Sequence, residues 1–149
     1  MVEIQPKLIQ AKMGVFKGNR ALVEVVLFSL LLEAALVAGK RHVHLISLVG
    51  AGDSITVHCA SGDDDLGVHV LSGEGQEFQW SFRVNIFRTT LFYCDVSWRD
   101  IPDFHFDAYD DKRDRYECSN CLWLFAPEGI YRWSDELQTW DFRFPWRPS

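Results

Sequence analysis

The sequence predicts an all-β fold: an antiparallel β-sandwich of two sheets with about eight strands, stapled by two disulfides and preceded by an N-terminal helical signal segment. Apolar and polar residues alternate with period two through most of the chain after residue 40, as they do in half-buried strands. Clusters of Gly, Ser, Asp and Pro separate the alternating runs at short intervals. Many short strands at this spacing are typical of a sandwich, with a small barrel as the second possibility.

The alternation is clearest in QEFQWSFRV, where Phe78, Trp80 and Phe82 fall on one side of the strand. With this run included, strands are expected at 41–49, 54–60, 66–71, 76–84, 89–98, 103–109, 116–125, 129–133 and 138–144. Turns are expected at 50–53, 61–64, 72–75, 110–114, 127–129 and 134–136. Residues 40–149 are therefore expected to form one β-sandwich domain, with residues 1–39 as an extension before it.

The extension has the layout of a secretory signal peptide. A basic stretch with Lys17 and Arg20 precedes an apolar stretch, and small residues follow it. The most apolar part, residues 25–32, is far shorter than the roughly 20 residues that span a membrane. We expect cleavage near Gly39 or Lys40. The alternative is a retained helix, packed on the domain or lying on a membrane surface, and two carboxylates within the apolar stretch favour that alternative.

All four cysteines, Cys59, Cys94, Cys118 and Cys121, follow the expected cleavage point. An even number of cysteines behind a signal peptide predicts two disulfides. Four cysteines allow three pairings. A bridge between Cys118 and Cys121 would close a very short loop and constrain the unfolded chain least. We therefore expect Cys59 to pair with Cys121 and Cys94 with Cys118.

The net charge of −6 and the pI near 5.3 exclude one class of partner. Binding to nucleic acid phosphates needs clustered Lys and Arg, and the sequence has no such cluster. No nucleic-acid partner is expected.

Three consecutive carboxylates in HCASGDDDLG, residues 58–67, raise the question of a calcium site. If Asp63 opened an EF-hand loop, Gly67 would take position 5, where an oxygen ligand is usual. Val68 would take position 6, where the sharp turn needs Gly. Strands rather than helices are expected on both sides, so the stretch does not fit this calcium motif.

The same stretch fits a hairpin turn. Ser61, Asp63 and Asp64 have short side chains that bond nearby backbone amides and tolerate left-handed conformations. Asp65 is then expected to cap backbone amides where the next strand begins.

The cysteines and histidines do not form a convincing catalytic or metal site. Cys118 and Cys121 have zinc-ligand spacing, but Cys59 and Cys94 stand alone, and an oxidising compartment favours disulfides. His58 cannot activate Cys59, because neighbours on a strand point to opposite faces. No hydrolase, phosphate-loop or dinucleotide motif occurs. We expect no enzyme activity, no cofactor and no metal.

Four motifs are more specific when they are taken in order: VHCASGDDDLG, FQWSFRVN, TTLFYCDVSW and CSNCLWLFAPEGIY. Together they resemble the plant self-incompatibility S1 family, also called S-protein homologues, over residues 41 to about 145. The resemblance implies a small secreted plant protein with a signal peptide, disulfides, an all-β fold and no catalytic residues. Founding members of that family are secreted by the stigma, are recognised by a pollen surface protein and determine pollen rejection.

Carried over residue by residue, the resemblance assigns the four cysteines to the disulfide framework. It implies a scaffold role for eight further motif residues: Asp64, Asp65, Leu66, Gly67, Trp80, Phe82, Trp98 and Trp123.

The leading interpretation is a secreted, monomeric, non-enzymatic signalling ligand for a cell-surface protein receptor, with no membrane contact after signal cleavage. Contact residues of such a ligand are expected on loops held by a rigid scaffold. The candidate recognition loop is the run of six charges Asp110, Asp111, Lys112, Arg113, Asp114 and Arg115, acting together with Asp63 to Asp65. The alternative for this run is a solvated hairpin tip.

Six tryptophans motivate an interpretation from a different class, an extracellular β-sandwich binding module for a carbohydrate or an apolar small molecule. Alternation places Trp80, Trp123 and Trp140 in the core. The remaining candidates for sugar platforms are Trp98, Trp133 and Trp146.

Overall fold

The computed structural model describes residues 20–147, except for the side chains of residues 33–38. The chain divides into two compact units, Met1–Gly39 and Lys40–Ser149. The first unit contains helix α2 (Arg20–Ala38), on which apolar side chains such as Phe28 are exposed. Lys17, in the basic part of the expected signal segment, lies outside the described residues. In the described part of the chain, no helix combines the length and the apolar character needed to cross a membrane.

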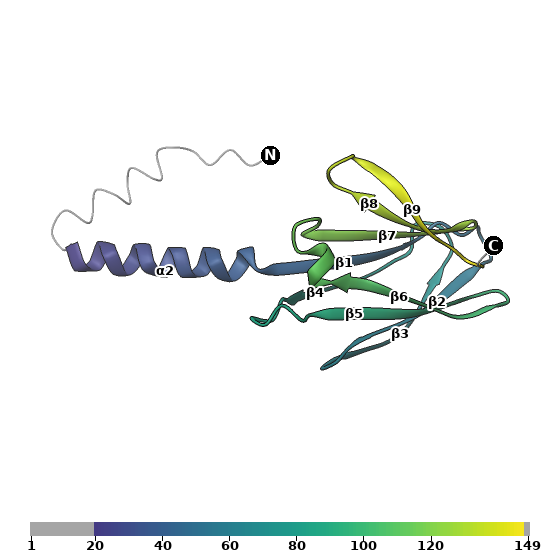
Figure 1. The fold of residues 1–149 in the computed structure, drawn as a ribbon, viewed down its shortest axis with the longest axis horizontal. Coiled ribbons are helices and arrows are strands. Elements are labelled where there is room, and N and C mark those ends of the chain that lie inside the picture. The colour runs from purple at the N-terminus through teal and green to yellow at the C-terminus, as the bar shows by residue number, and fades with distance from the viewer. Residues whose placement is uncertain (1–19, 148–149) are drawn as a thin grey trace. The chain divides into compact units, whose positions relative to one another are not determined.

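The second unit confirms the expected β-sandwich (Figure 1). Its strands are β1 (Lys40–Ser47), β2 (Ser54–Ser61), β3 (Asp65–Ser72), β4 (Glu77–Arg83), β5 (Leu91–Trp98), β6 (Ile101–Asp110), β7 (Asn120–Ala126), β8 (Gly129–Ser134) and β9 (Thr139–Pro145). Each lies within a few residues of an expected strand, because the alternation marks which runs bury one side.

The strands form a five-stranded sheet A, in the order β4-β1-β7-β8-β9, and a four-stranded sheet B, in the order β3-β2-β5-β6. Neighbouring strands are antiparallel with one exception. β1 and β7 run parallel, with His42 opposite Asn120 and Ser47 opposite Phe125. The sandwich is therefore not purely antiparallel, and β1 lies between β4 and β7 inside sheet A although it is the first strand in the chain.

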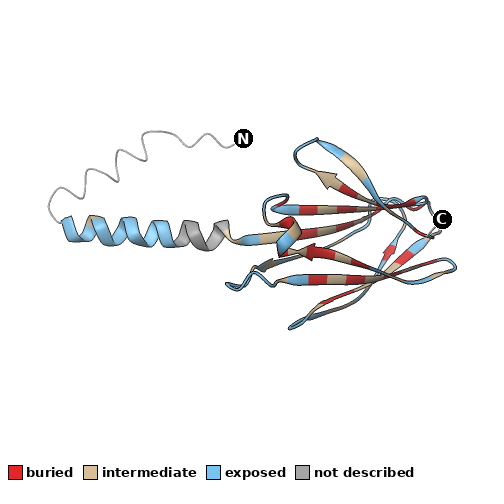
Figure 2. Ribbon diagram, viewed as in Figure 1, coloured by how far each residue is buried: buried red, intermediate tan, exposed pale blue. Residues whose placement is uncertain are grey.

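The core lies between the sheets and follows the alternation along the strands (Figure 2). Trp123 and Phe125 of sheet A face Val57 and Val96 of sheet B, and all four are essentially inaccessible to solvent. Trp123 also donates its indole N–H to the carbonyl of Ala108 at 2.9 Å, so its polar atom is satisfied. Full burial of such a side chain stabilises the fold by about 1.5–3 kcal/mol.

The expected disulfide pairing is wrong. The bridges are Cys59–Cys94 and Cys118–Cys121. Cys59 and Cys94 lie directly opposite each other on β2 and β5, with their Cα atoms 4.1 Å apart. Cys121 belongs to the other sheet. The disulfide pairing therefore follows the pairing of β2 with β5, which places Cys59 opposite Cys94, and does not follow loop-closure entropy.

Two of the three expected sugar platforms are buried, which corrects the assignment of the tryptophans. Trp98 points inward at the end of β5, and Trp146 packs against it with ring centroids 5.4 Å apart. The indole of Trp146 donates to the carbonyl of Ala126 at 2.7 Å. Trp133 is half-buried, and so is Trp140, which was expected in the core.

The segment between β6 and β7 also differs from expectation. Residues 110–114, expected as a turn, include the short helix α3 (Asp111–Asp114). Strand β7 begins only at Asn120 rather than at residue 116. The reason is local: the backbone N–H groups of Glu117 and Cys118 both donate to the carbonyl of Asp114 at 3.1 Å, so this stretch bonds to α3 instead of to a neighbouring strand.

Candidate recognition site

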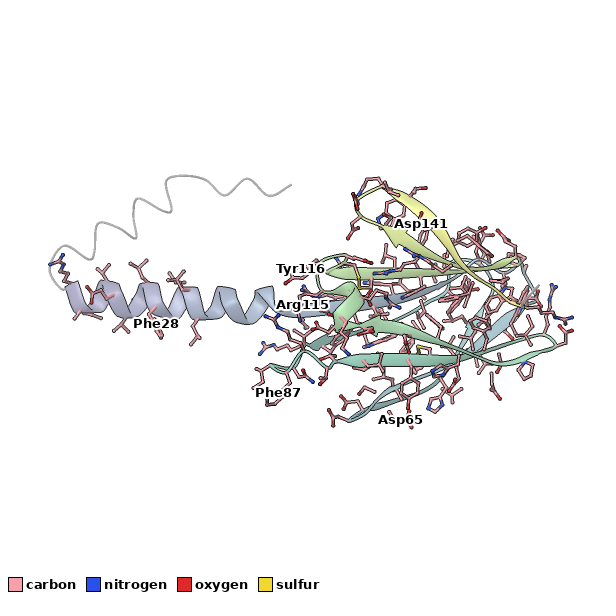
Figure 3. The ribbon with its side chains drawn as sticks, viewed as in Figure 1. Phe28, Asp65, Phe87, Arg115, Tyr116 and Asp141 are labelled. Atoms are coloured by element: carbon pink, nitrogen blue, oxygen red, sulfur yellow. A yellow bond between two sulfur atoms is a disulfide. The ribbon has the colours of Figure 1, made fainter. Side chains whose placement is uncertain are left out.

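One end of the domain contains the β4–β5 connection, α3 and the α3–β7 connection. Lys40 lies opposite Arg83 in the pairing of β1 with β4, and Leu91 lies opposite Asp110 in the pairing of β5 with β6. Figure 3 places Phe87, Arg115 and Tyr116 together at this end. We call the following surface the cationic end: Lys40, Arg83, Ile86, Phe87, Arg88, Lys112, Arg115 and Tyr116.

Three large apolar side chains project from the cationic end. Ile86, Phe87 and Tyr116 are 87%, 79% and 88% exposed, more than any other large apolar side chain among the described residues. Ile86 and Phe87 are adjacent at the tip of one loop. Contiguous exposed apolar groups on a protein surface mark an interaction surface.

Hydrogen bonds hold the loop that carries Phe87. The side chain of Asn85 donates to Thr89 Oγ1 at 2.8 Å and accepts from the Thr89 N–H at 2.9 Å. The backbone N–H of Asn85 donates to Thr90 Oγ1 at 2.8 Å. The Asp111 N–H donates to the carbonyl of Thr90 at 3.0 Å, which attaches the loop to α3. The tip is therefore a braced turn that holds its apolar side chains in solvent.

Cations surround these apolar groups. Among the described residues, Lys40, Arg83, Arg88 and Lys112 have no carboxylate within ion-pair distance. The nearby carboxylate of Asp110 instead accepts from the backbone N–H of Lys112 at 3.0 Å. This end therefore presents uncompensated positive charge, although the whole chain carries a net charge of −6.

A buried network under the cationic end fixes α3. The carboxylate of Asp111, 1% exposed, accepts from Arg115 Nη2 at 2.7 Å and from the Tyr109 hydroxyl at 3.1 Å. Burial alone would raise the pKa of Asp111, but the hydrogen bonds from Arg115 and Tyr109 outweigh it and hold that pKa below its ordinary value. Burial raises the pKa of Tyr109 to about 12, and the neighbouring Asp111 adds to the shift.

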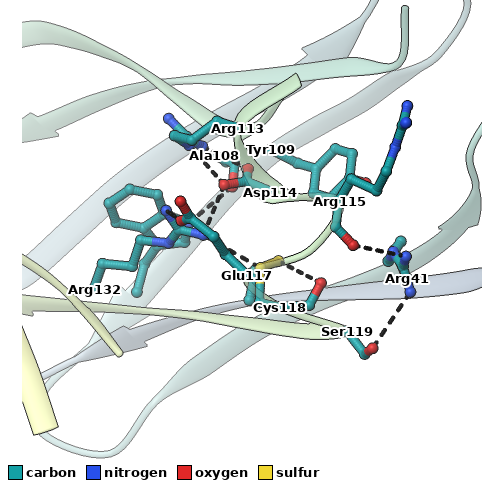
Figure 4. The surroundings of a disulfide bond; sticks show 12 residues. Arg41, Ala108, Tyr109, Arg113, Asp114, Arg115, Glu117, Cys118, Ser119 and Arg132 are labelled. Carbon is teal, nitrogen blue, oxygen red and sulfur yellow. Dashed lines mark hydrogen bonds and ion pairs between the residues drawn. A yellow bond between two sulfur atoms is a disulfide. The ribbon is translucent and has the colours of Figure 1, made fainter. Parts of the chain in front are cut away.

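The second buried carboxylate, Asp114, joins the two sheets (Figure 4). It accepts from Arg113 Nε at 2.6 Å and from Arg132 Nη2 of β8 at 2.7 Å. Arg132 also donates to Glu117 at 2.9 Å and contacts Cys118 Sγ at 3.4 Å. Both Asp114 and Arg132 are buried, so removal of either partner would leave a desolvated charge.

The six charges of the candidate recognition loop therefore separate into two groups. Lys112 is exposed, and Asp110, Arg113 and Arg115 are partly exposed. Asp111 and Asp114 are buried and are therefore not accessible to a partner, and each forms an ion pair with a neighbouring arginine. The run is thus neither a wholly exposed recognition loop nor a solvated hairpin tip.

Sequence reasoning missed Ile86, Phe87 and Tyr116. A signal was present in VNIFRTT, because two adjacent apolar residues break the alternation between the neighbouring strands. Such a pair belongs to no strand face, so it indicates an exposed loop tip.

The HCASGDDDLG stretch forms the expected turn between β2 and β3. Ser61 Oγ accepts from the backbone N–H groups of Asp63 and Asp64 at 3.3 and 3.0 Å. Asp65 caps the N–H of Gly67 at 2.9 Å and accepts from His58 at 2.8 Å. The bond from the Gly67 N–H, with a further one from His58, lowers the pKa of Asp65.

The remaining motif residues lie around the core. Phe82 contacts Phe92 and Tyr109, with ring centroids 4.5 and 4.8 Å apart, and Trp80 contacts Phe92 at 5.8 Å. Leu66 packs against the buried cluster. Gly67 has φ of 78°, in the left-handed region that favours glycine. Asp64 belongs to the turn and is exposed.

No metal centre is evident in the part of the chain that the structure describes. There, no three His, Cys, Asp or Glu side chains come together in a group that could hold a metal ion. The four cysteines form the two disulfides.

Comparisons with known proteins identify relatives of this chain. The family model described as plant self-incompatibility protein S1 matches residues 42–146. The chain is 37% identical to S-protein homolog 5 of Arabidopsis thaliana over 105 residues, which cover 70% of this chain and 77% of that protein. It is 34% identical to S-protein homolog 24 of the same plant over 122 residues, covering 77% and 81%.

A further relative carries the family's own name. Self-incompatibility protein S1 of Papaver rhoeas is 39% identical over 100 residues, which cover 66% of this chain and 71% of that protein. No solved structure matches the chain. The match to the family model over most of the β-sandwich shows that the chain belongs to the plant self-incompatibility protein S1 family.

Proposed function

We propose that the protein is a small secreted, non-enzymatic signalling ligand that acts as a monomer on a cell-surface protein receptor, and that the receptor contacts the cationic end. Membership of the self-incompatibility protein S1 family supports a role of this kind. The observation that carries the proposal is the group of exposed apolar side chains beside uncompensated cations on braced loops.

This surface has the composition of a protein interface. Aromatic residues and Arg are enriched at interface centres, and a few of them supply most of the binding energy. Phe87 and Tyr116 supply the aromatic rings, and Arg88 supplies a guanidinium. The matching receptor surface has an apolar pocket bordered by carboxylates, because unlike charges steer association and set its register.

Secretion is supported by the layout of residues 13–39 and by the disulfides, because disulfides persist in oxidising compartments. Expression of the full chain in plant cells, followed by intact-mass analysis of medium and cells, tests it. The expected species is in the medium, begins near Lys40 and is lighter by four hydrogens than the reduced chain. Full-length protein with free thiols inside the cells would refute secretion.

Receptor binding is tested with fluorescently labelled protein on intact plant cells. Phe87→Ser and the double change Arg88→Glu with Lys112→Glu are each expected to weaken saturable, protease-sensitive binding by about tenfold or more. The matched controls are Val68→Ser, which removes an exposed apolar side chain from β3, and Arg147→Glu, which reverses an exposed charge elsewhere. Both controls are expected to bind like the wild type.

Arg113 and Arg115 are left unchanged in these variants because each pairs with a buried carboxylate, and charge reversal there would disturb the fold. Thermal unfolding of every variant verifies folding. Unchanged binding by both site variants would remove the cationic end from consideration, and equal losses in sites and controls would point to non-specific attachment.

A further inference from the structure

The outer face of sheet A carries a continuous apolar surface. Ile46, Leu124, Tyr131 and Phe142 lie side by side across β1, β7, β8 and β9. A second row lies two residues further along the strands, and in this row Trp133 lies opposite Trp140. We call the following set the aromatic face: Ile46, Leu122, Leu124, Tyr131, Trp133, Trp140 and Phe142.

These residues are not part of the core. Their neighbours along β7 and β8, including Cys121, Trp123 and Arg132, point into the sandwich, so the aromatic face points outward. Phe142 is 50% exposed and the other members are partly exposed. An antiparallel sheet normally presents polar residues on its solvent side, whereas the solvent side of sheet A presents aromatic rings.

The rings are arranged in two pairs. Tyr131 and Phe142 have centroids 5.2 Å apart and planes at 72°, while Trp133 and Trp140 have centroids 5.4 Å apart and planes at 70°. At most one ring of each pair can therefore lie parallel to the sheet. The face thus offers at most one stacking position in each pair, and the two positions are about 7 Å apart because that is the spacing of every second residue along a strand.

Polar groups border the rings on the side of β1 and β4. His42 and His44 of β1 and Gln79 of β4 share the outer face with the rings. Glu77, on the same border, is paired with His44. The Tyr131 hydroxyl donates to Glu128 at 2.7 Å. The border therefore offers hydrogen-bond donors and acceptors and little uncompensated charge, unlike the cationic end.

We propose that the aromatic face binds a neutral oligosaccharide or polysaccharide chain. Sugar rings combine an apolar C–H face, which stacks on an aromatic ring, with hydroxyl groups, which bond to polar side chains beside it. Two stacking positions with a border of His42, His44 and Gln79 match both properties. The proposal does not rest on the receptor role of the cationic end.

The size and shape of the face select this ligand over two others. Three strand spacings of about 4.8 Å make it about 14 Å long, and two rows make it about 7 Å wide. A stable protein interface buries about 800 Å² on each partner, far more than this patch supplies. An apolar small molecule is normally enclosed for most of its surface, whereas this face is open. A chain of sugar rings needs neither a large area nor enclosure.

The test is calorimetric titration of the protein, expressed as the full chain in plant cells, with soluble hexasaccharides of β-1,4-linked glucose, β-1,3-linked glucose, β-1,4-linked xylose and β-1,4-linked mannose. At least one is expected to bind saturably. Trp140→Ala and Phe142→Ala are each expected to weaken that binding by about tenfold. Trp140→Phe keeps an aromatic ring and is expected to retain most of the affinity.

Phe87→Ala is the matched control, because it removes an exposed ring from the cationic end and is expected to leave sugar binding unchanged. Thermal unfolding verifies each variant, and Phe142, at the edge strand and half-exposed, tolerates truncation even if Trp140 does not. Absence of binding by the whole panel at millimolar concentration would overturn the proposal, as would unchanged affinity in the folded alanine variants. Self-association that Phe142→Ala abolishes would also overturn it, in favour of a second copy as the occupant.

Discussion

The outer faces of the two sheets differ, although their inner faces are alike. Across sheet A runs the aromatic face. Across sheet B the corresponding row is Val68, His58, Asp95 and His105, in which Asp95 accepts from His105 at 2.7 Å. Both inner faces are mainly apolar because the common core requires it, although sheet A also buries Arg132. Stability thus constrains every second residue, and the residues between them are free to differ between the sheets.

The largest expected effect separates the inner from the outer side of sheet A. Trp123→Ala removes a fully buried ring and is expected to lower the free energy of unfolding by about 3–5 kcal/mol. Trp140→Ala, on the outer side, is expected to lower it by about 1 kcal/mol, because surface changes rarely cost more. Urea unfolding monitored by circular dichroism measures both. Equal losses would show that the aromatic face is a second core rather than a free surface.

The two disulfides differ in the length of chain that each one closes. Cys59–Cys94 joins two strands of sheet B and closes a separation of 35 residues, whereas Cys118–Cys121, beside β7 of sheet A, closes 3. Loop-closure entropy predicts a loss of about 4 kcal/mol when the first bridge is replaced by two alanines and about 2 kcal/mol for the second. Denaturant unfolding of the two double variants tests the order. A larger loss for the short bridge would mean that its contact with Arg132 matters more than chain entropy.

Acid tests the buried network of Asp111 that fixes α3 next to β6 of sheet B. Unfolded aspartates titrate near pH 3.9, and the pKa of folded Asp111 is lower. Its contribution to stability is therefore complete above about pH 4 and is lost as the pH falls through the folded pKa. Asp111→Asn is expected to be less stable than the wild type at pH 7 and to lose less stability between pH 5 and pH 3.

Urea unfolding at several pH values checks this prediction, and parallel pH profiles for the two proteins would contradict it.

At alkaline pH the stability is expected to fall as the pH rises, because the pKa of Tyr109 is raised to about 12 in the folded protein. Its contribution is present below pH 10 and is lost as the pH rises toward 12.

The smallest effect is expected on the outer face of sheet B. His105→Ala removes an exposed pair with Asp95 and is expected to change the free energy of unfolding by about 0–1 kcal/mol, because solvent screens such pairs. Sugar and receptor binding are expected to be unchanged. Loss of either binding activity in this variant would transfer the functional surface from sheet A, or from the cationic end, to sheet B.

The sequence predicted where the strands lie better than it predicted which side of a strand is buried. Strict alternation places Trp140, Phe142 and Phe144 on one side of β9. In the structure a bulge shifts the register between β8 and β9, so that Phe144 lies opposite inward-pointing Ile130 while Phe142 lies opposite outward-pointing Tyr131. Phe144 packs on Trp123 and the two preceding aromatic residues face solvent.

The candidate sites were predictable in part. A run of charges before β7 directed attention to the end of the domain that carries the proposed contact surface, and Lys112 is exposed there. Asp111 and Asp114 could not be assigned to the interior from sequence, because their arginine partners include Arg132, which is distant in the chain. Charge alone does not distinguish a solvated carboxylate from one buried in an ion pair.

The sequence by itself determined the all-β class, the presence of paired cysteines and membership of the family, because alternation, composition and motif order are local properties of the chain. Only the tertiary structure decided that Cys59 pairs with Cys94, that two buried aspartates pair with arginines and that four aromatic rings form an outer face. The disulfide and the ion pair of Asp114 with Arg132 depend on which segments are neighbours in space. The outer face also depends on a one-residue bulge, because a shift of one residue moves every later side chain to the opposite face.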